Sequence, residues 1–334
     1  MSLQPLSLDE IRAAADGLAG QINVTPVVPW HGNELQRLLG AGTEVSVKLE
    51  QLQRSGTFKA RGALTAMLSA GEEALRAGVT AFSAGNHAVA TAYAAACLGT
   101  QAHVVMQQSA NWLRVAKARA YGAKIEMAVD GAAARRRAEE LVAQDGRFFV
   151  HPFENRDTVR GTATLGLEWI EQTAPLDAVI VSVGGGGLIS GVASAFRLLS
   201  PNTQIIGVEP EGADVMQRSL AAGTPQNMPT VTTIADSLGP PAAEPLTFEF
   251  CREYVHEFVR VSDAQIRDAM ALIFYDLNQA VEPAGAAATA ALIGPLRERL
   301  RGQRIGVLIC GSIIDADSFS KHIRDSGKTI PFDG

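Results

Sequence analysis

The sequence has few cysteines, a deficit of basic residues and no long apolar run. Its three cysteines, Cys97, Cys251 and Cys310, are far apart. They form neither a disulfide framework nor a zinc-ligand pattern, and they favour a reducing, cytoplasmic location. The formal net charge, 29 − 35 = −6, argues against nucleic acid and anionic membranes as partners. No run reaches the roughly 18 apolar residues of a membrane span, and residues 1–10 lack the features of a signal peptide.

What remains is a composition typical of a globular protein with a sizeable core. The 334 residues are 47% hydrophobic and 19% charged, enough for two domains of ordinary size. Short apolar runs alternate with longer amphipathic stretches, which predicts an α/β fold with parallel sheets covered by helices. Strands are predicted at residues 45–49, 79–82, 102–106, 124–128, 148–150, 178–183, 204–209 and 305–309. Helices are predicted at residues 8–19, 57–68, 88–98, 112–121, 131–144, 162–172, 188–199, 213–222, 262–275 and 284–299, with an irregular, proline-rich loop at 223–245.

Lys59 stands in an unusual place for a charged side chain. It lies in the first turn of a predicted helix, between Phe58 and Ala60. The positive end of the helix dipole and burial would both lower its pKa. A lysine with a lowered pKa suits covalent chemistry with a carbonyl group. A solvated surface lysine is the plain alternative, because most lysines are exposed.

Four consecutive glycines, residues 184–187, follow a buried strand and open a helix at Leu188. Their backbone amides and the helix N-terminus would fit a phosphate. A tight strand-to-helix turn is the structural alternative. The glycine pattern does not match the G-x-G-x-x-G fingerprint of dinucleotide folds, but Glu209 ends the next strand, where such folds place an acidic residue. A nucleotide-binding oxidoreductase therefore remains an alternative.

Three other groups of residues follow predicted strands or open predicted helices. Residues 83–87 could hold a carboxylate through exposed backbone amides, or simply cap a helix. Cys310 follows the last predicted strand, where ligands bind in sheets of this type, although buried inert cysteines are common. Glu282 could contact a ligand or favour the start of the helix that follows it.

Together these stretches resemble the pyridoxal-phosphate enzymes of fold type II, and among them the serine/threonine dehydratases. The resemblance rests on residues 55–63, 83–88, 151–153, 184–188, 208–210 and 281–285, which occur in the order typical of that family. It implies a two-domain fold, with a large cofactor-binding domain at residues 1–52 and 151–334 and a small domain at 53–150. It also implies pyridoxal 5'-phosphate as cofactor, an amino-acid substrate, and a homodimer.

The resemblance assigns a role to each matching residue. Lys59 would bind the cofactor covalently and remove the substrate Cα proton. Phe58 would pack on the cofactor ring, Asn86 would bind its hydroxyl, and Cys310 would face its pyridine nitrogen. The phosphate would lie on Gly184, Gly185, Gly186, Gly187 and Leu188, and Glu282 would lie beside the cofactor. The substrate carboxylate would be bound by Ser83, Ala84, Gly85, Asn86 and His87.

The implied reaction is elimination of water from a β-hydroxy amino acid such as serine or threonine, giving a 2-oxo acid and ammonia. A neutral thiol at Cys310 makes the cofactor ring a weaker electron sink, which suits elimination. Racemisation and β-replacement are alternatives. Ala84 stands where racemases of the family carry a serine, which disfavours racemisation. Glu209 and Ala213 match two ligands of a mono- or divalent cation site, but Val215 replaces the third, acidic residue.

Overall fold

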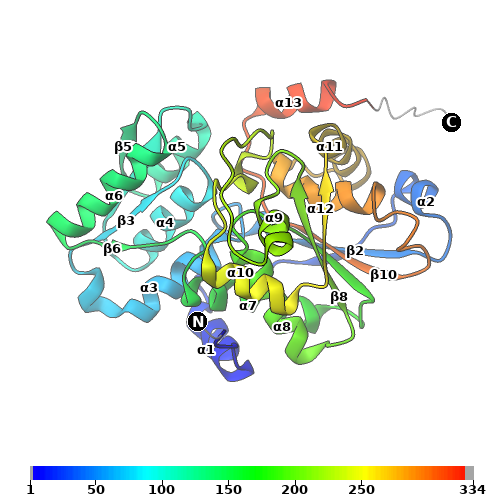
Figure 1. Ribbon diagram of the computed structural model, residues 1–334, viewed down its shortest axis with the longest axis horizontal. Coiled ribbons are helices and arrows are strands. Elements are labelled where there is room, and N and C mark those ends of the chain that lie inside the picture. Colours follow the sequence, from blue (N-terminus) through cyan, green and yellow to red (C-terminus); the bar gives the residue numbers. More distant parts are fainter. Residues whose placement is uncertain (1–2, 328–334) are drawn as a thin grey trace.

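The computed structural model describes residues 3–327, which form two sheets with helices packed around them (Figure 1). The larger sheet has the strand order β1-β2-β10-β7-β8-β9, and the smaller has β5-β4-β3-β6. All neighbours are parallel except β1 and β2. The predicted parallel α/β fold is therefore confirmed. The larger sheet contains β1 (Val27–Pro29), β2 (Glu44–Leu49), β7 (Ala178–Ser182), β8 (Gln204–Pro210), β9 (Glu257–Val261) and β10 (Arg304–Ile309).

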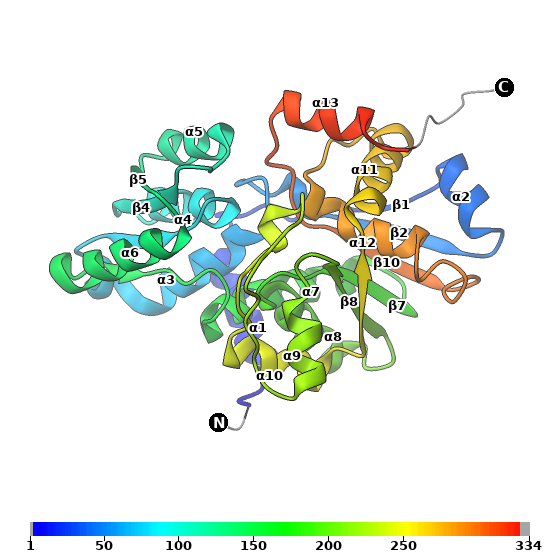
Figure 2. The same ribbon diagram turned by 45° about the horizontal axis from the view of Figure 1, so that its top comes forward.

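The smaller sheet lies within a continuous part of the chain. Its strands are β3 (Val79–Phe82), β4 (Ala102–Gln107), β5 (Lys124–Ala128) and β6 (Phe148–Phe149). The helices of this part are α3 (Lys59–Leu75), α4 (Asn86–Cys97), α5 (Trp112–Ala120) and α6 (Gly131–Asp145). Figure 2 shows this half beside the larger sheet, with α3 next to α7. The predicted domain boundaries, at residues 53 and 150, fit this arrangement and stay a prediction.

The remaining helices surround the larger sheet. They are α1 (Leu8–Leu18), α2 (Asn33–Leu39), α7 (Arg156–Gln172), α8 (Gly187–Leu199), α9 (Val215–Ala222), α10 (Pro245–Tyr254), α11 (Asp263–Leu277), α12 (Pro283–Ile293) and α13 (Ala316–Arg324), with short 3-10 turns η1 (Glu50–Leu52) and η2 (Asp236–Leu238). Strand β7 is buried along its whole length, as its continuous apolar sequence predicts. The largest apolar core lies around this sheet, and a second one lies between α3, α4 and the smaller sheet.

Several element boundaries differ from the sequence prediction. Helix α3 runs seven residues past the predicted end at Leu68, with a break at Gly71, whose φ is 79°. Helix α12 ends at Ile293 rather than at 299, because Gly294 leaves the helical conformation. The sequence analysis missed β9 and α10, which follow the proline-rich loop. Short or weakly patterned elements of this kind carry little signal of their own.

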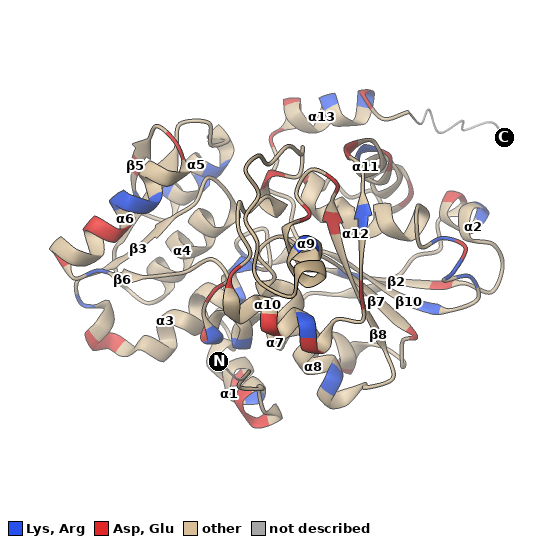
Figure 3. Cartoon of the chain, viewed as in Figure 1, with Lys and Arg blue, Asp and Glu red and all other residues tan. Residues whose placement is uncertain are grey.

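Charged residues of both signs lie over the outer helices, including α2, α6 and α13 (Figure 3). Within residues 3–327, none of the helices combines the length and the apolar character that crossing a bilayer requires.

Candidate active site

Lys59 is the first residue of α3, and its amine points into the structure. Its Nζ donates a hydrogen bond to the Pro152 carbonyl at 2.8 Å and lies 5.1 Å from the centre of the Phe58 ring. Loss of hydration lowers the pKa of Lys59 to about 8, although the nearby Cys310 thiol acts in the opposite direction. The amine therefore has a substantial neutral fraction near neutral pH, as the sequence analysis expected.

Backbone contacts hold the segment before Lys59 against the end of β10. Thr57 forms an antiparallel bridge with Gly311. The Phe58 amide donates to the Cys310 carbonyl at 3.2 Å. These bonds place Cys310, from the last strand of the larger sheet, in the same cavity lining as Lys59.

The glycine loop between β7 and α8 is closely covered by other segments. A Cβ atom on Gly185 would lie 2.3 Å from the Phe153 ring, and one on Gly187 would lie 2.8 Å from the Phe153 side chain. A Cβ on Gly184 would lie 3.0 Å from the Leu238 backbone. Gly186 has φ 86°, which side chains rarely adopt. The loop therefore needs glycine for both space and conformation, and α8 starts within it, which makes a binding place for an anion.

Asn86 and Glu282 meet in the lining of the same cavity as Lys59. The Asn86 Nδ2 donates to Glu282 Oε1 at 2.5 Å. Asn86 Oδ1 is buried and has no hydrogen-bond partner within the protein part described. Burial raises the pKa of the Glu282 carboxyl, while the Arg114 guanidinium acts against this rise. An unpaired buried amide oxygen indicates that this site is built to contact a polar group of a ligand.

Cys310 contributes a neutral thiol. Its Sγ lies 3.5 Å from the Ala284 carbonyl, to which it donates. Burial raises the pKa of the Cys310 thiol far above neutral. A protonated thiol would interact only weakly with the pyridine nitrogen of the cofactor, as the sequence analysis expected for Cys310.

The predicted cofactor residues lie together in one cavity. That cavity is lined by Phe58, Lys59, Asn86, Gly184, Gly185, Gly186, Gly187, Leu188, Glu282 and Cys310. Ser182, Phe153, Ser237 and Leu238 also line it, and the sequence analysis did not assign them to the cofactor. The roles of the predicted residues stay predictions, but their clustering is what those roles require.

A second cavity, of about 530 Å³, opens next to the first and shares Lys59, Asn86 and Phe153 with it. The predicted substrate segment, Ser83, Ala84, Gly85, Asn86 and His87, lines this space. Its backbone turns tightly, because the Gly85 amide donates to Ser83 Oγ at 3.1 Å. A substrate bound in the second cavity would therefore lie beside the Lys59 amine.

His87 contributes differently from its neighbours. Its Nε2 lies 2.7 Å from the Val150 carbonyl. Burial, followed by the charge of Lys59, lowers the pKa of His87 to about 3, so the ring is neutral. This nitrogen is engaged with the backbone, which fits a structural role for the ring.

Arg114 is a site residue that the sequence analysis missed. It comes from α5 and lies buried, with Nη2 at 3.2 Å from Glu282 Oε2 and Nη1 at 2.5 Å from Asp236 Oδ2. It therefore connects the smaller half of the molecule to the loop at η2 and to the start of α12. A single arginine in an amphipathic helix is not distinguished by its sequence spacing from its exposed neighbours.

Glu209, one of the two expected cation ligands, already accepts hydrogen bonds within the protein. Glu209 accepts hydrogen bonds from the Met216 and Gln217 amides, both at 2.8 Å. Burial raises the pKa of Glu209 to about 8, although these amides act in the opposite direction. No group of three or more His, Cys, Asp or Glu side chains suited to a metal was found among residues 3–327. A cation at Glu209 and Ala213 stays a prediction without further support.

Comparison with known proteins agrees with this geometry. The sequence model of the family described as pyridoxal-phosphate dependent enzyme matches residues 18–311. Phenylserine dehydratase of Ralstonia pickettii is 52% identical over 84% of this chain and 86% of its own. A solved threonine deaminase from T.th. is 37% identical with a TM-score of 0.86, covering 93% of this chain and 99% of its own. Maize serine racemase is 31% identical with a TM-score of 0.89, covering 96% and 98%.

Proposed function

The chain belongs to the pyridoxal-phosphate-dependent enzyme family and dehydrates β-hydroxy amino acids, and we propose that its preferred substrate carries an aryl group on Cβ, as phenylserine does. The reaction converts the amino acid to a 2-oxo acid and ammonia. The observation that supports the site assignment is that Lys59 lines one cavity with the glycine loop. Burial also lowers the pKa of its amine to about 8. The observation that supports the aryl substrate is the 52% identity to a phenylserine dehydratase.

The residues present fit pyridoxal 5'-phosphate. When bound, this cofactor withdraws electrons from the substrate Cα. The loop at Gly184, Gly185, Gly186 and Gly187 would hold the phosphate, and the unpaired oxygen of Asn86 marks where a polar ring group would lie. Cys310 offers a neutral thiol, which leaves a pyridine nitrogen less protonated than a carboxylate would.

Lys59 is assigned two duties in this proposal. It would hold the cofactor covalently and, once free, would remove the substrate Cα proton as general base. The lowered pKa of Lys59, about 8, supports the second duty, because a base with a pKa near the working pH is efficient. The β-hydroxyl then leaves with a proton, and the product is hydrolysed to the 2-oxo acid and ammonia.

The cavity beside Lys59 supports an aryl substituent. Its volume of about 530 Å³ exceeds what a methyl group needs, and its lining includes Phe82, Phe153, Pro240 and Pro241. Aromatic and proline side chains offer apolar contact to a phenyl ring. One extra methylene in an apolar pocket raises kcat/KM by about 10-fold or more. A phenyl group is larger than a methyl group by more than one methylene, so we expect it to raise kcat/KM by at least that factor.

The test is a comparison of kcat/KM for phenylserine, threonine and serine, with released ammonia as the common readout. We expect phenylserine to exceed threonine by about tenfold or more, and Lys59→Ala to abolish turnover of all three. A preference for threonine or serine would overturn the aryl proposal. Full turnover by Lys59→Ala would overturn the assignment of the base.

Racemisation is the second candidate, because serine racemase of maize shares the fold with a TM-score of 0.89. Ala84 lines the substrate cavity and offers no hydroxyl to protonate the opposite face of the substrate. Chiral chromatography during the same assays separates the two activities. We expect elimination without accumulation of the opposite enantiomer.

A further inference from the structure

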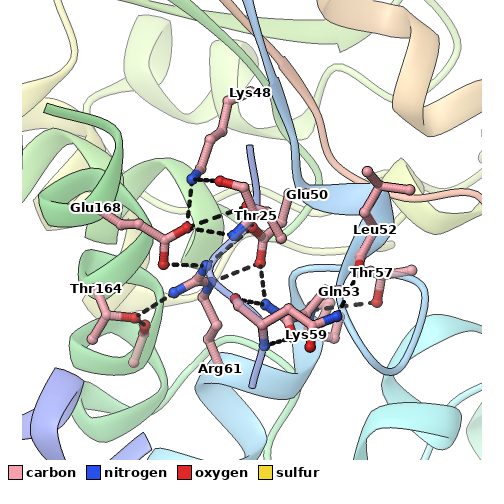
Figure 4. Close-up of polar contacts among 12 residues, drawn as sticks. Thr25, Lys48, Glu50, Leu52, Gln53, Thr57, Lys59, Arg61, Thr164 and Glu168 are labelled. Carbon is pink, nitrogen blue, oxygen red and sulfur yellow. Dashed lines mark hydrogen bonds and ion pairs between the residues drawn. The ribbon is translucent and has the colours of Figure 1, made fainter. Parts of the chain in front are cut away.

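A cluster of two cations and two anions lies near Lys59, and none of its four residues lines either cavity. We name Lys48, Glu50, Arg61 and Glu168 the Arg61 cluster (Figure 4). We propose that Arg61 is a positioning residue for Lys59: through this cluster it fixes the first turn of α3 against the larger half of the molecule. The proposal rests on the role assigned to Lys59 under the proposed function.

The contacts of Arg61 are numerous and directional. Its Nε lies 2.6 Å from Glu50 Oε1, and its Nη2 lies 3.1 Å from Glu50 Oε2 and 2.9 Å from Glu168 Oε2. Its Nη1 donates to Thr164 Oγ1 at 3.2 Å. The Arg61 and Glu50 side chains are 1% and 0% exposed, so water does not compete for these bonds. A guanidinium fork bound in this way defines an orientation as well as a charge.

These partners come from elements of the larger half. Glu50 is in η1, directly after strand β2, and Glu168 and Thr164 are in α7. Lys59 and Arg61 are two residues apart on α3, so their side chains leave the helix in different directions. Arg61 thus binds the larger half while Lys59 faces the cavity, and both share one helical turn.

Backbone packing reinforces this attachment. A Cβ atom on Gly161 of α7 would lie 2.4 Å from the Arg61 carbonyl, so α3 and α7 approach as closely as backbones can. On the other side, the amide of Phe58 is bonded to the Cys310 carbonyl at 3.2 Å. The first turn of α3 is therefore held from two directions, with the Arg61 side chain as its polar anchor.

The plain alternative is that Arg61 only neutralises buried carboxylates. Lys48 provides a control for this alternative, because its Nζ lies 2.5 Å from Glu168 Oε1 and is fully buried. Its other bonds go to the Thr25 carbonyl at 2.7 Å and to Gln172 Oε1 at 2.8 Å. Lys48 is thus a buried cation of the same cluster. Within residues 3–327, its hydrogen bonds go to segments other than α3. Its loss should therefore lower stability without moving Lys59.

The experiment compares wild type, Arg61→Met, Arg61→Lys and Lys48→Met as holoenzymes, and as apoproteins given pyridoxal phosphate. The readouts are the melting temperature, kcat and KM with phenylserine, and the rate of the visible absorbance change when the cofactor attaches. We expect both Met variants to melt earlier, because Arg61→Met leaves the buried Glu50 carboxylate without its cation and Lys48→Met removes one of the two cations that pair with Glu168. Below the melting range, we expect Arg61→Met and Arg61→Lys to lose about tenfold or more in kcat and in attachment rate, because small misplacements of reacting groups are costly.

Lys48→Met is expected to stay within about threefold of wild type in kcat and attachment rate, because the hydrogen bonds of Lys48 go to Thr25, Glu168 and Gln172 and none of them reaches the helix that carries Lys59. Equal losses of kcat in Lys48→Met and the Arg61 variants, or full activity in Arg61→Lys, would overturn the proposal. If Arg61→Met does not fold, the Arg61→Lys variant tests the proposal, because it keeps the positive charge but lacks the planar guanidinium group. Absence of cofactor attachment in wild type would instead overturn the proposed function.

Discussion

The surrounding protein shifts the Lys59 amine toward its neutral form, which is the form that reacts with a carbonyl group. Its pKa is lowered to about 8 by burial, from an ordinary value of 10.5. Only the neutral amine attacks a carbonyl group, so the shift raises the reactive fraction near neutral pH by roughly a hundredfold or more, at one tenfold step per pKa unit. The place of Lys59 in the first turn of a helix predicted the direction of this shift.

The first prediction concerns the pH dependence of that reactivity. The folded pKa of Lys59 lies below its unfolded value, so the neutral form is reached at lower pH in the folded protein. We expect the rate of pyridoxal phosphate attachment to the apoprotein to rise about tenfold per pH unit below about pH 8 and to level off above it. Stopped-flow absorbance from about pH 6 to 10 measures this. A rate that still rises about tenfold over the last pH unit of that range would show an unshifted lysine.

The other residues of the site were harder to identify from the sequence than Lys59. Asn86 and Cys310 were assigned by resemblance, and both line the cavity with Lys59. Arg114 was missed, because what distinguishes it is its burial between Glu282 and Asp236, which lie far away in the chain. Contacts between residues so distant in sequence leave no periodic pattern to read.

At the scale of elements, the glycine loop between β7 and α8 leaves little room for larger residues. We predict that Gly185→Ala raises the dissociation constant of pyridoxal phosphate by at least about tenfold, a loss of about 1.4 kcal/mol. The physical reason is that the added Cβ would lie 2.3 Å from the Phe153 ring, so the loop must shift. Fluorescence titration of the apoprotein measures the constant.

Gly17→Ala serves as the control for that substitution. A Cβ at Gly17, in α1, would meet only Leu68 at 3.9 Å, an ordinary contact. We expect unchanged cofactor affinity in this variant, because a helical alanine is tolerated there. Equal affinity in Gly185→Ala and wild type would show that the loop does not hold the phosphate.

Helix α5 contributes Arg114, which holds the start of α12 to the smaller half. We predict that Arg114→Gln lowers the free energy of unfolding by about 3 kcal/mol, because Glu282 would keep a buried carboxyl without its cation. Urea unfolding measures this, with the exposed Lys117→Gln on the same helix as control, expected within about 0.5 kcal/mol of wild type. A loss below about 1 kcal/mol for Arg114→Gln would mean that the pair stabilises little.

Across the elements, the alternation of strands and helices was predictable because each has its own hydrophobic period. The exceptions were β1, α2, β9, α10 and α13, which the sequence analysis missed, and the end of α12, which lies at Ile293 rather than at residue 299. Strand β9 lies at the edge of the larger sheet and is only partly buried, which weakens its apolar pattern. The boundary errors follow from local backbone conformation, which a periodic pattern does not encode.

At the scale of the whole molecule, the candidate site is made by both sheets together. Cys310 directly follows β10, the glycines follow β7, and Asn86 is the first residue of α4, which follows β3. Ligands of parallel sheets bind beyond the carboxyl ends of strands, and here such ends from two sheets meet. A homodimer and a cytoplasmic location stay predictions at this scale.

The most direct test of this account is the absorbance spectrum of the purified protein given pyridoxal phosphate, before and after borohydride reduction. We predict a visible band that disappears on reduction, with the added mass located on Lys59 by peptide mapping. The absence of such a band, or an adduct on another lysine, would contradict the assignment of Lys59 and of the cavity around it.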